Sequence, residues 1–200
     1  IIQQIHEFVM RGLLQNPGQY RTENVSITGA KVRPPSYLKI VKLMDEYVKN
    51  IEKFKLHTIK KVAFIHHEFV RIHPFIDGNG RVARLLTNFY LIKKGYPPIV
   101  IQKEDRKKYY KTLSKADQGN LSDFASFIAR LVNESLQYYL SSFIDEERLV
   151  PLSELSKKSD YSQEYLSLRA RQGKLDAVKI ENIWYSSKRA LKDYQKSIKK

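Results

Sequence analysis

Apolar residues recur every three or four positions along most of the chain up to about residue 145, which is the pattern of helices that bury one face. In one place the pattern differs, because Val25, Ile27 and Val32 surround Thr28-Gly29 and predict a short β-hairpin between residues 20 and 33. We therefore expect a mainly α fold with one small β element. The spacing predicts helices at 1–14, 36–54, 58–71, 80–94, 103–117 and 121–143.

After Arg148 the pattern changes to shorter elements. It predicts a short helix from Val150, a turn at 159–162 and a second helix at 163–172 that stops at Gly173. A hairpin formed by 175–180 and 183–185 and a last helix from Lys188 complete the series. We interpret this compact plan as a second domain, with the first domain at 1–147 and the second at 148–200.

Charge and composition narrow the class of protein. The net charge is +15, divided as +9 up to Arg148 and +6 after it, so nucleic acid, a nucleotide, an acidic protein or an anionic surface are candidate partners. The chain has no cysteine, which excludes a disulfide scaffold and a cysteine-based zinc site and favours a reducing, cytoplasmic location. No apolar run approaches a membrane span and no signal peptide is present, so we expect no membrane partner. Because the chain begins at Ile1 inside a helical pattern, we expect it to belong to a longer protein.

The stretch HPFIDGNGRVAR, residues 73–84, concentrates the candidate chemistry. Its second half, residues 78–83, matches the dinucleotide fingerprint G-x-G-x-x-(G/A), but that fingerprint requires a preceding strand. Here Val62, Ile65, Phe69 and Ile72 recur at helical spacing, so a Rossmann turn is not expected. The sequence instead predicts a helix, a glycine-rich turn and a second helix.

Each polar group of this turn suits a different atom in a nucleotide-transfer reaction. The unpaired amides at the start of the second helix can bind an anion, and Gly78 and Gly80 let the backbone approach phosphate oxygens. Arg81 and Arg84 share one helix face and can reach phosphates, while Asp77 can hold Mg²⁺ and His73 can accept a proton. An isolated Asp-Gly or Asn-Gly is usually only a turn or a cap; the combination of all these groups within twelve residues favours a functional site.

The stretch resembles the signature of Fic domains, HxFx(D/E)GNGRxxR, at every fixed position. The resemblance extends over residues 1–143. The family's target-binding flap is similar to Tyr20-Arg21-Thr22 with Pro34-Pro35. The segment that follows the family's core is similar to Gly95-Tyr96-Pro97-Pro98, Asp105-Arg106 and Tyr109-Tyr110. It implies a Fic-type helical domain with a small β-hairpin flap.

The resemblance also implies an activity, the transfer of AMP from MgATP to a Ser, Thr or Tyr hydroxyl of a target protein, with the chain itself as one candidate target. His73 is implied as the general base, Asp77 as the metal ligand, Arg81 and Arg84 as ligands of the β- and γ-phosphates, and Val25, Ser26, Ile27 and Thr28 as the flap that pairs with the target. The implied nucleotide-binding residues are Asp77, Gly78, Asn79, Gly80, Arg81, Val82, Ala83, Arg84, Tyr109, Ile27, Thr28 and Gly29.

Two alternatives remain open at this stage. The same pocket could remove AMP with a metal-bound water, or the Fic fold could be vestigial in a DNA-binding regulator; the intact motif argues against the second. Many Fic proteins carry an inhibitory helix with the motif (S/T)xxxE(G/N). Ser142 to Glu146 has its spacing, but Glu147 stands where Gly or Asn is expected, so our hypothesis is that this helix lies before Ile1 or was removed. His66 and His67 are adjacent and point in different directions on a helix, so we expect structural roles for them rather than a metal site.

The segment LSELSKKSDYSQEYLSLRARQGKLDAVKIENIWYSSKRAL, residues 152–191, resembles winged helix-turn-helix modules of the excisionase/MerR kind. The resemblance implies a recognition helix at 163–172, Asn182 at the tip of the wing and Trp184 in the small core. DNA is then a candidate partner, contacted by Gln163, Arg169 and Arg171, although such modules also dock proteins. A homodimer is a candidate assembly.

Overall fold

The computed structural model describes residues 1–27, 32–141, 148–180 and 182–198. Its backbone divides into two compact units, Ile1–Val132 (unit 1) and Asn133–Lys200 (unit 2). The division falls inside a helix, α6 (Leu121–Ser141). Residues 142–147, which were compared with the inhibitory motif, lie outside the described part. The predicted domain boundary at 147/148 therefore stays a prediction.

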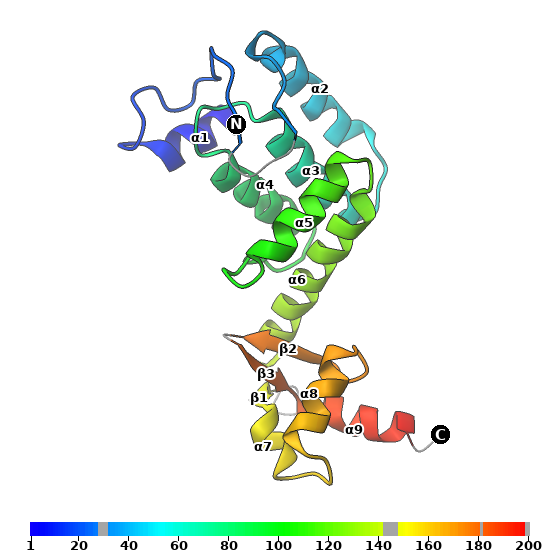
Figure 1. Cartoon of the computed structure of the whole chain (residues 1–200). Helices are drawn as coiled ribbons and strands as arrows, with labels where there is room; N and C mark the ends of the chain where they lie inside the picture. Colours follow the sequence, from blue (N-terminus) through cyan, green and yellow to red (C-terminus); the bar gives the residue numbers. More distant parts are fainter. Residues whose placement is uncertain (28–31, 142–147, 181, 199–200) are drawn as a thin grey trace. The chain divides into compact units, whose positions relative to one another are not determined.

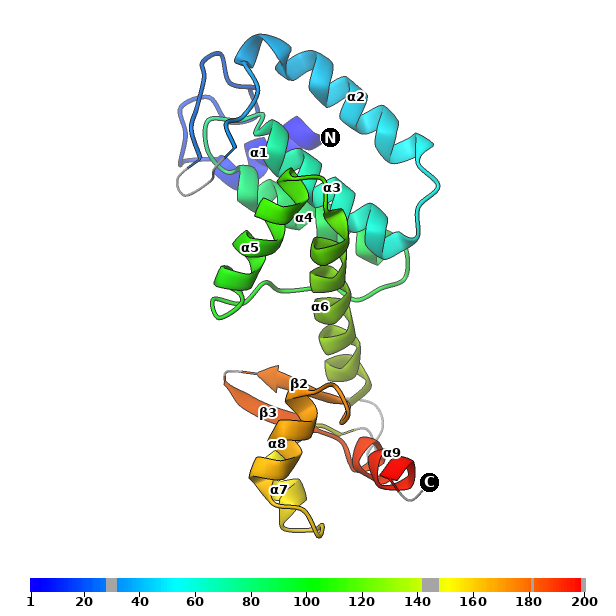
Figure 2. The ribbon, with the colours of Figure 1, turned by 45° about the vertical axis from the view of Figure 1, so that its right-hand side comes forward.

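Unit 1 is helical, which confirms the predicted mainly α class (Figure 1). The two helices that flank the turn of the motif, α3 (Thr58–Ile72) and α4 (Asn79–Lys93), pack side by side in both ribbon views (Figures 1 and 2). The first helix ends at Met10 rather than at Leu14, because Arg11 is extended and Gly12 has a positive φ of 76°. The elements of unit 1 are α1 (Ile2–Met10), the 3₁₀ turn η1 (Tyr37–Lys39), α2 (Ile40–Lys53), α3 (Thr58–Ile72), α4 (Asn79–Lys93), α5 (Arg106–Asp117) and the start of α6.

Two apolar clusters hold these helices together, and α3 and α4 contribute residues to both. The first joins α3 and α4 to α5 and α6 through residues that include Val62, Leu91, Tyr109, Phe124 and Ile128. The second joins α2 to α3, α4 and the turn that connects α3 with α4. Its members include Ile40, Met44, Tyr47, Phe69, Phe75 and Val82. Because the turn between α3 and α4 contributes Phe75 to the second cluster, its backbone is anchored in the core.

The predicted β-hairpin at 20–33 is wrong for the residues that are described. Residues 20–27 and 32–36 contain bends and irregular chain but no strand, and Thr28 and Gly29 lie outside the described part. Arg21 binds the carbonyl oxygens of Glu23 and Pro35, so the two ends of this segment are joined by a side chain instead of a backbone ladder. Pro34 and Pro35 also lack the N–H groups that a strand partner would need.

Unit 2 contains the helix, turn, helix, hairpin and helix that the sequence predicts. The strands form an antiparallel sheet in the order β1-β3-β2, with Val150 opposite Ser186 and Val178 opposite Tyr185. The pattern missed β1 because it has only two residues and one of them is proline. Trp184 is half-buried against the core of this unit, as predicted. The elements are β1 (Val150–Pro151), α7 (Leu152–Ser156), α8 (Gln163–Arg171), β2 (Ala177–Ile180), β3 (Ile183–Ser186) and α9 (Lys188–Ile198).

Among the described residues, none of the helices combines the length and the apolar character needed to cross a bilayer.

The core of unit 1 contains a fully buried histidine, His66 on α3. Its ring lies 3.0 Å from the Thr87 hydroxyl through Nδ1 and 2.9 Å from the Tyr109 hydroxyl through Nε2. Burial lowers the pKa of His66 to about 3, and the positive charge of Arg84 acts in the same direction. His66 is therefore neutral in the folded protein near pH 7, whereas in the unfolded chain it becomes protonated below about pH 6.5.

We expect the loss of this buried histidine to change the pH dependence of stability. The unfolded chain takes up a proton on His66 and the folded chain does not. Between pH 7 and pH 5, the free energy of unfolding of wild-type unit 1 should therefore fall by roughly 2 kcal/mol more than that of His66→Gln. Urea unfolding followed by circular dichroism at several pH values measures this difference. Trp184 is the only tryptophan and lies in unit 2, so its fluorescence provides an internal control. A difference that is constant with pH would contradict the prediction.

Candidate functional site

The site is built on the turn between α3 and α4, residues 73–78. The turn begins at His73, whose φ of 52° and ψ of 60° place it in the left-handed region, and Pro74 prevents further helix. The turn ends at Gly78, which caps α4 with a φ of 77°. Because a helix precedes the glycines, the structure agrees with the prediction that this is not a Rossmann turn.

Asn79, the first residue of α4, braces this turn. Its side-chain Oδ1 accepts the N–H of Phe75 at 3.0 Å, and its Nδ2 donates to the carbonyl of Phe75 at 2.8 Å. The side chain is only 2% exposed. Both ends of the amide are therefore engaged with the backbone, which leaves Asn79 its main-chain N–H and the second hydrogen of Nδ2 as donors.

Gly78 is required by space as well as by its backbone conformation. A Cβ atom there would lie 2.7 Å from Sδ and 2.8 Å from Cγ of Met10, a buried residue of α1. The same sulfur accepts a hydrogen bond from Nη1 of Arg81 at 2.9 Å. Helix α1 is thus pressed against the start of α4, and Met10 orients one of the two motif arginines.

His6, also on α1, fixes the acidic part of the turn. The amide of Gly18 donates to Nδ1 of His6 at 2.8 Å, so the ring proton is on Nε2, which donates to the carbonyl of Asp77 at 3.0 Å. The ring also stacks on Phe75 with centroids 3.7 Å apart. Burial lowers the pKa of His6, which favours the neutral tautomer that these contacts require.

The ring of His73 is oriented by α3. Its Nδ1 lies 3.2 Å from the carbonyl of Val70, which can only accept, so Nδ1 carries the proton and Nε2 keeps its lone pair. Burial is the main cause that lowers the pKa of His73, and the charge of Arg21 lowers it further, against opposing effects of Val70 and Asp77. The imidazole is therefore held neutral, with a free basic nitrogen, near pH 7.

An anion-binding surface lies at the start of α4. The amides of Arg81 and Val82 are bonded to the carbonyl of Gly78, whereas for those of Asn79 and Gly80 no acceptor is found in the described part of the chain. A Cβ atom on Gly80 would meet Nη1 of Arg84 at 3.5 Å, so this guanidinium lies over the helix start. No salt bridge of Arg81 or Arg84 is found among the described residues, which leaves both charges available to a ligand.

Asp77 lies at the edge of this surface and is exposed. One carboxylate oxygen, Oδ1, accepts the N–H of Gly78 at 2.6 Å, which fixes the side chain and leaves Oδ2 for a cation. A carboxylate oxygen is a ligand that Mg²⁺ prefers, and one or two protein carboxylates together with phosphates are its usual partners in nucleotide sites. No group of three or more potential metal-binding side chains is found among the described residues, so a metal here would depend on phosphate oxygens for its remaining ligands.

Two of the predicted nucleotide-binding residues have buried side chains, so their contact with a nucleotide stays a prediction. The side chains of Val82 and Ala83 are 0% exposed and belong to the core, and the amide of Val82 is already bonded to Gly78. The reason is helical geometry, because Arg81 and Arg84 share one face of α4 and the two residues between them turn towards the opposite face.

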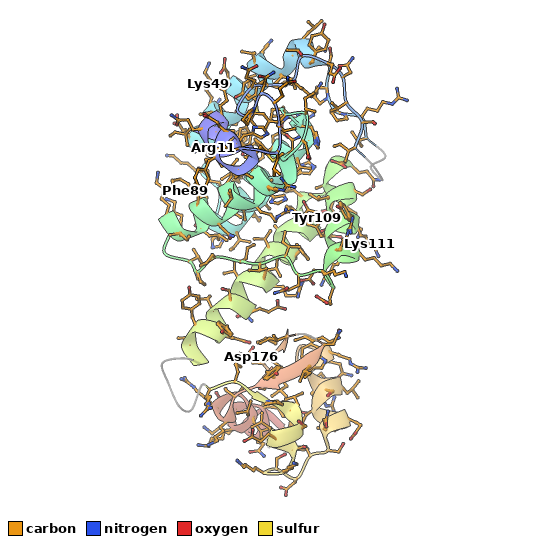
Figure 3. The ribbon with its side chains drawn as sticks, turned by 90° about the vertical axis from the view of Figure 1, so that its left-hand side faces the viewer. Arg11, Lys49, Phe89, Tyr109, Lys111 and Asp176 are labelled. Atoms are coloured by element: carbon orange, nitrogen blue, oxygen red, sulfur yellow. The ribbon has the colours of Figure 1, made fainter. Side chains whose placement is uncertain are left out.

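The remaining predicted residues of the first domain differ in their surroundings. Tyr109 on α5 (Figure 3) is buried in the first core cluster with its hydroxyl on His66, so its contact with adenine stays a prediction. Val25 and Ile27 are half-buried and Ser26 is exposed; Thr28 and Gly29 lie outside the described part. His66 and His67 have separate partners, since Nε2 of His67 lies 2.9 Å from Oδ1 of Asp117. This separation agrees with the structural roles expected for them.

In unit 2, two of the three predicted DNA-binding residues lie together. Gln163 and Arg171 line an open pocket of about 240 Å³ with Asn182 and Trp184. Arg169 differs, because its guanidinium lies over the ring of Tyr165, 4.7 Å from the centroid, and donates to Gln172 at 3.0 Å. Arg169 therefore packs within its own unit, and Arg171 is the better placed of the two arginines to contact a ligand.

Three residues position this site: His6 and Met10, which were not predicted as functional, and Arg21, which was named only as part of the flap resemblance. Each lies 50 or more positions before the group that it contacts. In the sequence, Met10 is one apolar position of an amphipathic helix, and only the Tyr20-Arg21-Thr22 resemblance drew attention to Arg21. A buried polar residue within an apolar helix face, such as His6, was the available signal.

Comparison with known proteins agrees with this geometry. Residues 1–91 match the Fic/DOC family. The chain is 38% identical over 136 residues to the protein adenylyltransferase Fic of Aedes aegypti, covering 68% of this chain and 27% of that protein. It is 32% identical over 154 residues to the one of Drosophila persimilis, covering 76% of this chain and 30% of that protein. The chain thus spans less than a third of the length of these curated relatives.

Solved structures show the same fold. Fic-1 of C. elegans (residues 134–508) superposes with a TM-score of 0.63 at 30% identity, over 70% of this chain and 42% of that one. A Fic family protein from Desulfovibrio desulfuricans superposes with a TM-score of 0.64 over 93% of this chain and 67% of that one; at 23% identity this shows the fold alone.

We expect Gly78→Ala to destabilise unit 1 more than a glycine change that affects backbone conformation alone. Gly95 has nearly the same φ, 78°, but no atom within 4 Å of its Cβ position, so Gly95→Ala is a matched control. Gly95→Ala should lower the free energy of unfolding by about 1–2 kcal/mol because alanine is strained in the left-handed region. Gly78→Ala should lower it by roughly 1–3 kcal/mol more because its methyl group also overlaps Met10. Urea unfolding of both variants measures the difference. Equal costs would show that Met10 yields without strain.

Proposed function

We propose that this chain, whose first 91 residues match the Fic/DOC family, transfers AMP from MgATP to a hydroxyl side chain of a target protein. The observation that carries the proposal is the combination of a free Nε2 on His73 with an open anion-binding surface at the start of α4. At that surface, the amides of Asn79 and Gly80 have no acceptor, and Arg81 and Arg84 have no salt bridge, among the described residues. The names of the curated relatives support the same activity. In the reaction the hydroxyl oxygen forms a bond to the α-phosphorus of ATP. The bond between the α-phosphorus and the oxygen that bridges it to the β-phosphorus breaks, and pyrophosphate leaves.

The residues of the turn suit a triphosphate. The main-chain amides of Asn79 and Gly80 face the phosphates at the positive end of α4, and Arg81 and Arg84 compensate the charge of the leaving pyrophosphate. Oδ2 of Asp77 would hold Mg²⁺, which supplies further charge compensation on the phosphate oxygens when bound. Positioning and charge compensation are the main sources of rate in phosphoryl-type transfer.

His73 acts as the general base in this proposal. The carbonyl of Val70 holds the proton on Nδ1, so Nε2 takes the proton of the attacking hydroxyl. The lowered pKa keeps the ring unprotonated at neutral pH, which a base requires. The imidazolium formed in the transfer later returns its proton to water.

The target protein is expected to pair with the segment around Val25, Ser26 and Ile27 by strand addition. Within the described residues, no main-chain hydrogen bond is found for these three, so their N–H and C=O groups can bond to an extended peptide. The carbonyls of Glu23 and Pro35 are instead bound by Arg21, which holds the two ends of the segment in place.

Incubation with ATP labelled at the α-phosphate tests the proposal. With Mg²⁺ and a cell lysate, wild type should label the chain itself or a lysate protein, and His73→Ala should label it about 10²- to 10⁴-fold more slowly because the base is lost. His57→Asn is the control, since His57 is an exposed histidine whose side chain caps α3, and asparagine can keep that cap. Label that appears only from γ-labelled ATP would indicate a kinase and overturn the proposal, as would no label at all. Loss of label from AMP-modified protein would indicate the removal reaction.

We also propose that unit 2 is a winged helix-turn-helix domain, beginning near residue 148, that contacts DNA. Helices α7 and α8 are followed by the β2–β3 hairpin, and β1 completes the sheet, which is the order of elements in such modules. The segment after Arg148 has a net charge of +6. The pocket formed by Gln163, Arg171 and the turn residue Asn182 is the feature that favours DNA over a purely structural role.

Binding of a fluorescent duplex at two or more salt concentrations tests this second proposal. We expect affinity to fall steeply with salt, and Arg171→Gln to reduce the slope of log K against log salt by about 1, the value for one lost phosphate contact. Lys196→Gln, on the exposed face of α9, is the control. Absent or salt-independent binding to duplexes of mixed sequence would contradict DNA contact and leave protein docking as the role of unit 2.

A further inference from the structure

Arg21 is a buried cation whose partners are all carbonyl oxygens. Its side chain donates to the carbonyls of His73 through Nε at 2.8 Å, of Glu23 through Nη1 at 2.7 Å and of Pro35 through Nη2 at 2.5 Å. The residue is 3% exposed, and no salt bridge of Arg21 is found in the described part of the chain. Burying a charge without a carboxylate is costly, so the position has a role that a neutral side chain would not fill.

The main chain of Arg21 strengthens the same connection. Its N–H donates to the carbonyl of Pro74 at 2.9 Å, next to the carbonyl of His73 that its side chain binds. Arg21 therefore holds two successive carbonyls at the start of the turn. His73 occupies the left-handed region, which costs a residue with a Cβ about 1–2 kcal/mol and persists only where surrounding contacts impose it. The two bonds from Arg21 impose that conformation.

The position of the His73 backbone determines the position of its basic nitrogen. The ring is tied through Nδ1 to the carbonyl of Val70, in the last turn of α3, so a shift of the His73 main chain would break this bond or move Nε2. A lysine could not replace the arginine, because its three donors lie on one nitrogen, whereas the flat guanidinium reaches three carbonyls in separate directions.

We propose that Arg21 is a positioning residue that sets the location of the His73 base and couples it to both ends of the target-binding segment. This inference rests on the proposed function. Arg21 has no contact with Asp77, Asn79 or the start of α4 among its hydrogen bonds, so it acts on the base and the target rather than on the nucleotide. The expected consequence is a split between the transfer rate and the apparent affinity for ATP.

The test compares Arg21→Lys and Arg21→Gln with Arg71→Lys. Arg71 is paired with Glu68 on the last turns of α3, only two residues before His73, and does not touch its carbonyl. At saturating MgATP, the rate of self-labelling or of labelling a lysate protein should fall about 10- to 100-fold in both Arg21 variants, the usual effect of a misplaced catalytic group. The half-saturating ATP concentration should change less than about twofold, as expected when nucleotide contacts are retained. Arg71→Lys should leave both values close to wild type.

Rates are expressed per folded molecule, with the folded fraction measured by circular dichroism at the assay temperature, so instability alone cannot imitate the result. An unchanged rate per folded molecule in Arg21→Lys would overturn the proposal. A parallel rise in the half-saturating ATP concentration would also overturn it, because it would show a general loss of the site.

A second measurement separates this inference from the proposed function. Diethyl pyrocarbonate modifies neutral imidazoles, and mass spectrometry of peptides follows His73 and the exposed His57 in the same sample. In Arg21→Lys the modification rate of His73 should rise several-fold while that of His57 stays unchanged. If wild type shows no AMP transfer, the proposed function fails, and the His73 rate still decides whether Arg21 positions this ring. An unchanged His73 rate would overturn the positioning role.

Discussion

The candidate site depends on side chains from the first 21 residues that hold a turn 50 to 70 residues later in the sequence. The turn between α3 and α4 contains two left-handed residues, His73 and Gly78, and only one of them is glycine. Arg21 fixes its beginning and His6 fixes its end, while Asn79 joins its middle to α4. Without these contacts the turn could satisfy its backbone groups with water in many conformations, and the base and the amides would have no fixed relation.

The electrostatics of the site follow from this arrangement. Three guanidinium groups, those of Arg21, Arg81 and Arg84, lie around a turn whose one acidic side chain is Asp77. The two arginines on α4 are available to an anion, whereas the buried Arg21 acts on His73 and lowers its pKa. The positive charges therefore divide into two groups. Arg81 and Arg84 are available to an anion, and Arg21 favours the neutral imidazole, which can accept a proton.

The sequence could predict the local part of this site because the motif is contiguous. A helix on each side of the turn and the shared face of Arg81 and Arg84 follow from spacing within residues 62–84, whereas the cap at Gly78 is seen only in the structure. His6, Met10 and Arg21 could not be identified in this way, because their function depends on where α1 and the following segment pack. Val82 and Ala83 differ from these three residues, because their side chains are buried in the core. The family resemblance included them, although their place between Arg81 and Arg84 already predicts the buried face of α4.

The segment at 20–36 shows why a β-pattern alone was misleading. Alternating Val25 and Ile27 favour an extended chain, but an extended chain becomes a strand only when its N–H and C=O groups find a partner. Two prolines on one side remove donors, and Arg21 takes the carbonyls of Glu23 and Pro35 that would flank a hairpin. Arg21 joins Glu23 to Pro35 through its side chain, and the main chain of residues 25–27 has no hydrogen-bond partner in the described part of the chain. The replacement of a ladder by one guanidinium explains the absence of a strand among the described residues of this segment, and it leaves backbone groups for the target pairing that we propose.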